Sequence, residues 1–111
     1  MQHWHLLALD APEGTRDPTV LLSDDGSRAV LVALAAGQEL GDHQVKENAW
    51  VIVVDGTVRV TAGGETIDGG VGSTFHFAPD ERHSLRSESG ARILLLLAPW
   101  PGVGHYRGSE T

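Results

Sequence analysis

The sequence contains no cysteine among its 111 residues. This absence excludes disulfide bonds, thiolate zinc sites and a cysteine nucleophile. A long hydrophobic run is also missing, because the longest apolar stretch, Ile93 to Pro99, is far too short to span a bilayer. The first residues, Met1 to His5, lack the basic start and apolar run of a signal peptide. We therefore expect a soluble protein of the cytoplasm.

Basic residues are few and dispersed. Eight Lys and Arg residues stand against fifteen Asp and Glu residues, which gives a formal net charge of −7. An acidic chain without a basic stripe is a poor candidate for binding nucleic acid or an anionic membrane, so we expect neither partner. The length suits one domain. We expect a single domain over residues 1–111, with a barrel core at about 19–99 and a loose tail at 102–111.

Patterns typical of amphipathic helices, of nucleotide-binding loops and of serine hydrolases are absent as well. No window of a dozen residues has a convincing helical stripe, and there is no G-x-G-x-x-G, P-loop or G-x-S-x-G motif. Short β-prone runs are separated instead by turns that contain glycine, which is typical of a sandwich or barrel. The predicted strands are Thr19–Ser23, Ala29–Ala35, Ala49–Val54, Thr57–Thr61, Ser73–Phe77, Arg82–Arg86 and Arg92–Ala98.

Two of these runs, Trp50–Val54 and Ile93–Leu97, are apolar on both faces. Such strands need cover on both sides, from the barrel interior and from a second layer or a partner subunit. Val58 and Val60, in contrast, alternate with polar residues and suit a half-solvated sheet. We therefore predict a homodimer, with a well-covered monomer as the alternative.

Two segments resemble the paired motifs of the cupins. The first is Gly37–Val45 followed by Val51–Gly56, and the second is Gly72–His83. Their order, their separation and their strand context together carry the resemblance, which extends over roughly Leu21 to Pro99. It implies an all-β fold, the double-stranded β-helix or jelly-roll barrel of a small single-domain bacterial cupin.

The first cupin motif has the form G-x5-H-x-H-x3-E-x6-G. Gly37 and His43 match it, but the second histidine falls on Val45 and the glutamate on Ala49. The histidine of the second motif falls on His83, although its P-x-G lead-in has become Ala78-Pro79-Asp80. The resemblance therefore leaves His43 and His83 as the metal ligands that match the family.

The loss of two of the family's metal ligands weakens the case for a catalytic metal in this chain. A catalytic first-row metal commonly needs three or four nitrogen or oxygen ligands, and Val45 and Ala49 cannot coordinate one. Glu47 lies near the missing glutamate, but we expect it in a turn, and the sequence does not determine which way His76 faces. The predicted metal ligands are His43 and His83, with Glu47 as a weaker candidate. The predicted pocket residues are His43, Val45, Ala49, His76 and His83.

These residues support several functions. The preferred one is a binding module for a small organic molecule, with His43 and His83 as polar contacts. The alternative is a metal-dependent enzyme of the dioxygenase, isomerase or decarboxylase type, using Zn, Ni, Mn or Fe and a recruited third ligand, as the resemblance implies. A metal-free enzyme with one histidine as general acid–base, and a regulatory or structural dimer, are further alternatives. No catalytic residue is assigned.

Overall fold

The computed structural model describes residues 1–14 and 18–103, which build nine strands and no helix. The strands are β1 (Thr19–Ser23), β2 (Arg28–Leu34), β3 (Gln38–His43), β4 (Asn48–Gly56), β5 (Val58–Ala62), β6 (Glu65–Gly69), β7 (Thr74–Phe77), β8 (His83–Ser87) and β9 (Ala91–Ala98). Over the described residues there is accordingly no helix that could cross a membrane. The predicted loose tail falls mostly on residues 104–111, outside the described part.

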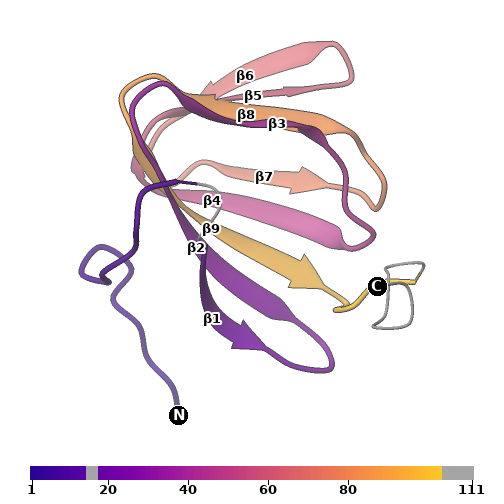
Figure 1. Ribbon diagram of the computed structural model, residues 1–111. Coiled ribbons are helices and arrows are strands. Elements are labelled where there is room, and N and C mark those ends of the chain that lie inside the picture. Colours follow the sequence, from indigo (N-terminus) through magenta and orange to yellow (C-terminus); the bar gives the residue numbers. More distant parts are fainter. Residues whose placement is uncertain (15–17, 104–111) are drawn as a thin grey trace.

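The strands form two antiparallel sheets that face each other (Figure 1). The five-stranded sheet has the order β1-β2-β9-β4-β7, and the four-stranded sheet has the order β3-β8-β5-β6. Strands distant in sequence become neighbours, since β2 pairs with β9 and β3 pairs with β8. The prediction of an all-β fold is confirmed.

The hydrophobic core lies between the two sheets and follows the alternation of side chains along each strand. On β4, Ala49, Val51 and Val53 point inward and are buried, while Trp50 and Ile52 point outward and are half-buried. Strand β9 repeats the pattern. The other buried core residues are Val30, Val32, Leu34, Val58, Val60, Phe77, Leu85, Ala91, Ile93 and Leu97.

Each of the seven predicted strands overlaps an observed one, but β3 and β6 were not predicted. Strand β6 is exposed at four of its five positions, and its single large apolar residue, Ile67, faces solvent. Strand β3 has one apolar side chain, Leu40, among Gln38, Glu39, Gly41, Asp42 and His43. Neither segment has the alternation of apolar and polar residues that reveals a strand in a sequence.

The segment before β1 covers part of the outer face of the five-stranded sheet. Leu31 and Ala33 point away from the core on β2, yet they are only 0% and 5% exposed. The amide of Gly14 donates to the carbonyl oxygen of Ala33 at 2.7 Å, and Arg92 Nη1 donates to the carbonyl oxygen of Leu6 at 2.7 Å. These bonds hold residues 6–14 over the β2 side of that face.

Candidate functional site

A β-bulge brings the two motif histidines together. Strands β3 and β8 pair Leu40 with Leu85 and then His43 with His83, so β3 has one residue more than β8 over this interval. Without that extra residue, the alternation from Leu40 would turn His43 to the opposite face. With it, the imidazole rings of His43 and His83 lie with their centroids 4.3 Å apart.

His83 is embedded in the interior of the barrel. Its side chain is 5% exposed, and its ring stacks on Phe77 with a centroid distance of 3.8 Å and an angle of 3° between the planes. Ala62 of β5 is its cross-strand neighbour on the other side of β8. His43 is half-buried, so the pair runs from the interior toward the surface. Phe77 lies within the second motif, but sequence reasoning did not identify it as a contact of His83.

The two histidines have the same hydrogen-bond arrangement. Nδ1 of His43 lies 2.6 Å from the carbonyl oxygen of Gly41, and Nδ1 of His83 lies 3.0 Å from that of Glu81. Because a carbonyl oxygen only accepts, each Nδ1 carries the proton and donates. In the neutral rings each Nε2 is therefore a hydrogen-bond acceptor or a metal ligand.

Burial lowers the pKa of His83 below its ordinary value of 6.5, and the nearby His43 lowers it further. The hydrogen bond to the Glu81 carbonyl and the carboxylates of Glu81 and Asp42 act in the opposite direction. Removal of the imidazole from water is the largest effect and disfavours the charged form. The interior end of the pair is thus a neutral acceptor at neutral pH.

Two loops close over this end of the barrel and hold each other. The amide of Asp80 donates to the carbonyl oxygen of Val45 at 2.7 Å, and Lys46 Nζ lies 2.8 Å from Asp80 Oδ1. Arg82 bonds Asp42 at 2.7 Å through Nη2. These contacts join the β3–β4 connection to the β7–β8 connection and fix the strand ends from which both histidines extend.

The predicted pocket residues separate into two groups. Ala49 is 1% exposed inside the core opposite Phe77, and Val45 packs partly buried against the same core. His76 lies apart from them, at the margin of a cavity between β6 and β7. It pairs with Trp50 across β7 and β4, where its ring lies 4.9 Å from that of Trp50 and its Nε2 lies 2.9 Å from Asn48 Oδ1. Because its neighbour Phe77 points inward, His76 points to the outer face.

Glu47 does not complete a metal site either. Its side chain is fully buried, and Oε2 accepts a hydrogen bond of 2.7 Å from the amide of Gly102 in the segment after β9. No cluster of three or more His, Asp or Glu side chains suited to a metal occurs within residues 1–14 and 18–103. Two imidazoles alone do not fit the three-ligand set of a catalytic metal. Glu47 ties the C-terminal segment to the β3–β4 connection.

A cavity of about 270 Å³ opens where the four-stranded and five-stranded sheets part, between β6 and β7. Its apolar lining includes Val60, Ala62 and Phe77, and two of these residues also contact or adjoin His83. Polar groups at its margin include Glu65, His76 and Glu81. The cavity therefore lies against the wall that encloses the buried imidazole.

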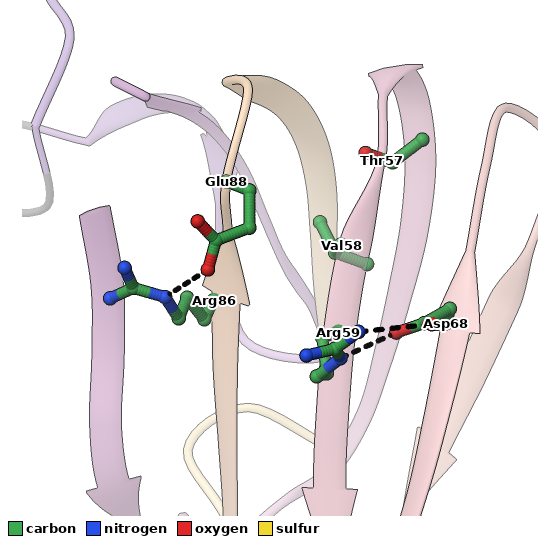
Figure 2. A pocket seen from close by; sticks show the side chains of 6 residues that line it. All are labelled: Thr57, Val58, Arg59, Asp68, Arg86 and Glu88. Carbon is green, nitrogen blue, oxygen red and sulfur yellow. Dashed lines mark hydrogen bonds and ion pairs between the residues drawn. The ribbon is translucent and has the colours of Figure 1, made fainter. Parts of the chain in front are cut away.

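A second hollow, of about 260 Å³, lies on the outer face of the four-stranded sheet and is lined by charged side chains (Figure 2). Arg59 on β5 contacts Asp68 on β6 at 2.8 Å, and Arg86 on β8 contacts Glu88 at 2.7 Å. Each guanidinium has its own carboxylate, so the hollow has no excess charge to attract an ion. All four side chains are substantially exposed, which is typical of a solvated sheet surface.

Solved structures resemble this fold over nearly the whole chain. A protein with a double-stranded β-helix domain from Klebsiella pneumoniae superposes with a TM-score of 0.77 at 17% identity, covering 92% of this chain and 93% of that chain. An RmlC-like cupin from Desulfovibrio desulfuricans gives 0.75 at 19% identity, covering 89% and 96%. A cupin superfamily protein from Desulfitobacterium hafniense gives 0.75 at 14% identity, covering 84% and 85%. These likenesses confirm the predicted double-stranded β-helix.

The search of curated proteins found no match. The family model described as the cupin domain matches residues 30–98, a span that contains His43, His83 and all strands from β3 to β9. This match covers more than half of the chain. The protein therefore belongs to the cupin family.

Proposed function

We propose that this cupin binds a small organic molecule beside the His43–His83 pair. The observation that carries the proposal is the pair itself: two adjoining imidazoles, each with Nδ1 engaged by a carbonyl and Nε2 left as an acceptor. The cavity lined in part by Phe77 and Ala62, which contact or adjoin His83, adds a concave surface of mixed polar and apolar character on the far side of those two residues. A concave surface with a few placed polar groups is what small-molecule sites usually offer.

The arrangement favours a ligand of particular chemistry. Neutral imidazoles with Nδ1–H committed to carbonyls accept hydrogen bonds through Nε2, so the ligand supplies an O–H or N–H donor. Phe77 and Val60 suit a flat, apolar portion of the same molecule. The cavity of about 270 Å³ is close to the lower end of the range for ligand pockets, roughly 300 Å³. We therefore expect a small, uncharged ligand with one or two donors.

Phenol and anisole form a matched pair of probes, because they share a ring and only phenol has an O–H donor. We expect phenol, titrated into isotope-labelled protein, to shift the NMR signals of Ala62, Phe77 and His83. We expect anisole to bind about 3- to 10-fold more weakly, the usual net value of one hydrogen bond. In His83→Leu this preference should disappear. No shift at these residues with phenol, or an unchanged preference in the variant, would contradict the proposal.

A second candidate function is metal-dependent catalysis of the dioxygenase, isomerase or decarboxylase type. It is favoured by the Nδ1–carbonyl contacts of both histidines, since histidines that bind a metal through one ring nitrogen typically donate the other to a carbonyl. Against it stand Val45 and Ala49 at two ligand positions of the family motif.

Elemental mass spectrometry of untagged protein distinguishes the two functions. Near-stoichiometric metal that is lost in the His43→Ala/His83→Ala double variant would favour the enzyme. Metal at background in both proteins is the result expected for the binding module. A polyhistidine tag must be absent because it would bind metal itself.

A further inference from the structure

We propose that Asp25, in the bend between β1 and β2, is a modification site at which aspartate converts spontaneously to isoaspartate (Figure 1). Asp25 and Gly26 are adjacent in this bend, and both are exposed to solvent. The reaction consumes no reagent other than water. The site is separate from the two histidines, so the inference does not depend on the ligand proposed above.

The chemistry is an attack of the main chain on the preceding side chain. The amide nitrogen of Gly26 bonds to Cγ of Asp25, and the side-chain hydroxyl leaves as water together with a proton, which closes a five-membered succinimide. A water molecule then reopens the ring. Its addition at Cγ restores aspartate, whereas its addition at the main-chain carbonyl carbon gives isoaspartate, whose main chain runs through Cβ and Cγ. Glycine favours ring closure because it has no Cβ to crowd the attacking nitrogen.

The sequence contains three Asp–Gly links, at Asp25, Asp55 and Asp68, each followed directly by glycine. Local sequence therefore does not distinguish them, and the fold has to. Ring closure requires the peptide after the aspartate to rotate toward its own side chain. A peptide fixed in a strand ladder must first open locally, and that opening costs free energy which an exposed bend does not have to supply.

Asp68 is held by both its side chain and its main chain. Its carboxylate accepts from Nε of Arg59 at 2.8 Å and from Nη2 at 3.3 Å. Gly69 is buried and pairs with Val58 in the β5–β6 ladder. The hydrogen bond from Arg59 also keeps the pKa of Asp68 below its ordinary value, so the protonated carboxyl that can lose water is rarer. This link should react slowly.

Asp55 is also fixed in a ladder. It pairs with Arg92, and Gly56 pairs with Ala91, in the β4–β9 ladder. Gly56 has a φ of +77°, and a Cβ on it would collide with the carbonyl oxygen of Gly90. The main chain at this link is therefore enclosed by the neighbouring strand end and has little room to rotate.

The bend at Asp25 is held at its ends and not at the reactive link. The amide of Asp24 donates to the carbonyl oxygen of Ser27 at 3.1 Å, and the amide of Ser27 donates to Oδ1 of Asp24 at 3.2 Å. Within residues 1–14 and 18–103, no hydrogen bond engages the Gly26 amide or the Asp25 carboxylate. The peptide between them can rotate without breaking a hydrogen bond.

Conversion at Asp25 should affect the segment after β9. The carbonyl oxygen of Gly26 accepts from the amide of Trp100 at 3.0 Å. Isoaspartate lengthens the main chain by one atom just before Gly26 and so displaces that carbonyl. We expect hydrogen exchange at the Trp100 amide to be faster in the converted protein than in fresh protein. Unchanged exchange would show that the Gly26–Trp100 bond survives and would contradict this consequence.

Prolonged incubation of the full chain at neutral pH and physiological temperature tests the proposal. Peptide mapping with electron-transfer dissociation distinguishes isoaspartate from aspartate. We expect isoaspartate at Asp25 to form about 10-fold or more faster than at Asp55 or Asp68, where a ladder must open first. Gly26→Ala should slow the reaction, since the added methyl group crowds the attacking nitrogen. The variant should fold, because the nearest atom to that Cβ is Oδ1 of Asp24 at 3.8 Å.

Three asparagine variants separate the effect of the fold from that of the local sequence. Asp25→Asn, Asp55→Asn and Asp68→Asn close the same ring with loss of ammonia, which intact-mass measurement follows directly. In the folded protein we expect the first to deamidate fastest, and in concentrated urea we expect the three rates to converge. Equal rates in the folded protein, or incubated wild-type protein without isoaspartate at Asp25, would overturn the proposal.

Discussion

Burial of His83 changes how the protein responds to acid. Its pKa in the folded protein is lowered from 6.5 by loss of hydration and by the nearby His43. Between that lowered pKa and 6.5, the unfolded chain binds a proton that the folded chain does not. The free energy of unfolding should therefore fall as the pH drops from 6.5 toward the folded pKa, and His83 should contribute nothing to this slope above 6.5.

His83→Gln removes this proton linkage. We expect urea unfolding of the variant to show a smaller loss of stability below about pH 6.5 than the wild type shows. His76→Gln is the matched control, because it removes an exposed imidazole on the outer face and leaves the buried His83 in place, so the linkage that His83 contributes should persist. An equally steep decline in His83→Gln would show that other groups dominate the acid response.

Gly102 lets the C-terminal segment approach the β3–β4 connection closely. A Cβ at this position would lie 2.5 Å from the carbonyl oxygen of Lys46, and the Gly102 amide donates to the buried carboxylate of Glu47. The chain beside this carbonyl is held on its other side, because the carbonyl oxygen of Val45 accepts from the Asp80 amide and the Lys46 ammonium pairs with the Asp80 carboxylate.

We expect Gly102→Ala to reduce the free energy of unfolding by about 1–3 kcal/mol, the usual range for overpacking. Gly70→Ala is the matched control, since the nearest atom to an added Cβ lies at 4.0 Å. Chemical denaturation of both variants measures the difference. Equal stability of the two variants would mean that the segment after β9 can move aside without loss.

Among single residues, the sequence predicted His43 and His83 by their motif positions, and the structure places them in contact. It could not predict the side on which His76 lies, because that depends on which face of β7 meets the core. Glu47 was expected in a turn near a metal position. Its bond to Gly102 joins residues 55 positions apart, and no local pattern reveals such a contact.

At the scale of the strand, the bulge in β3 determines the geometry of the site. Leu40 and His43 both face partners that point inward on β8, although simple alternation would separate them. Hydrophobic periodicity predicted the strands that have a clearly apolar face. It missed β3 and β6, because these strands consist mostly of polar residues. The pairing register between β3 and β8 could not be predicted, because it is determined by contacts between strands that are distant in the sequence.

The loop between β7 and β8 has a strained position that can be tested. Asp80 has a φ of +65°, the left-handed region in which a Cβ is unfavourable. We expect Asp80→Ala to be less stable than Asp80→Gly by about 1 kcal/mol, because both lose the contact with Lys46 and only alanine bears the steric cost. Thermal unfolding of the two variants gives the order.

Asp25 provides the reversed comparison. It lies exposed in the bend between β1 and β2 and does not have a positive φ. There Asp25→Ala should be at least as stable as Asp25→Gly, because glycine only adds freedom to the unfolded chain. If alanine were also the better residue at position 80, the left-handed conformation would not be a constraint on this loop.

For the whole molecule, the two sheets have opposite surfaces. The hollow on the four-stranded sheet is lined by Arg59, Asp68, Arg86 and Glu88, whereas the shallow depression on the outer face of β4 and β9 is lined by Ser27, Trp50, Ile52, Leu96, Leu97 and Ala98 and by no charged side chain. The first surface is suited to water, and the second leaves apolar side chains partly exposed. This asymmetry appears in the sequence as the contrast between the alternating Val58–Ala62 strand and the two runs that are apolar on both faces.

Salt should distinguish the homodimer that the sequence predicts, formed through the two runs that are apolar on both faces, from a dimer held by ion pairs. Each copy has a net charge of −7, so two copies repel each other at distances that counterions can screen. The Debye length falls from about 30 Å at 0.01 M salt to about 8 Å at 0.15 M, which weakens that repulsion while leaving the apolar contact unchanged. We therefore expect the dissociation constant of the dimer, measured by sedimentation at several sodium chloride concentrations, to decrease as salt rises. An interface held by ion pairs between exposed side chains, of the kind that Arg59 and Asp68 form within the chain, would respond in the opposite direction, because screening weakens the attraction between exposed charges. A dimer that dissociates as salt is added would therefore contradict an interface on the apolar side chains of β4 and β9.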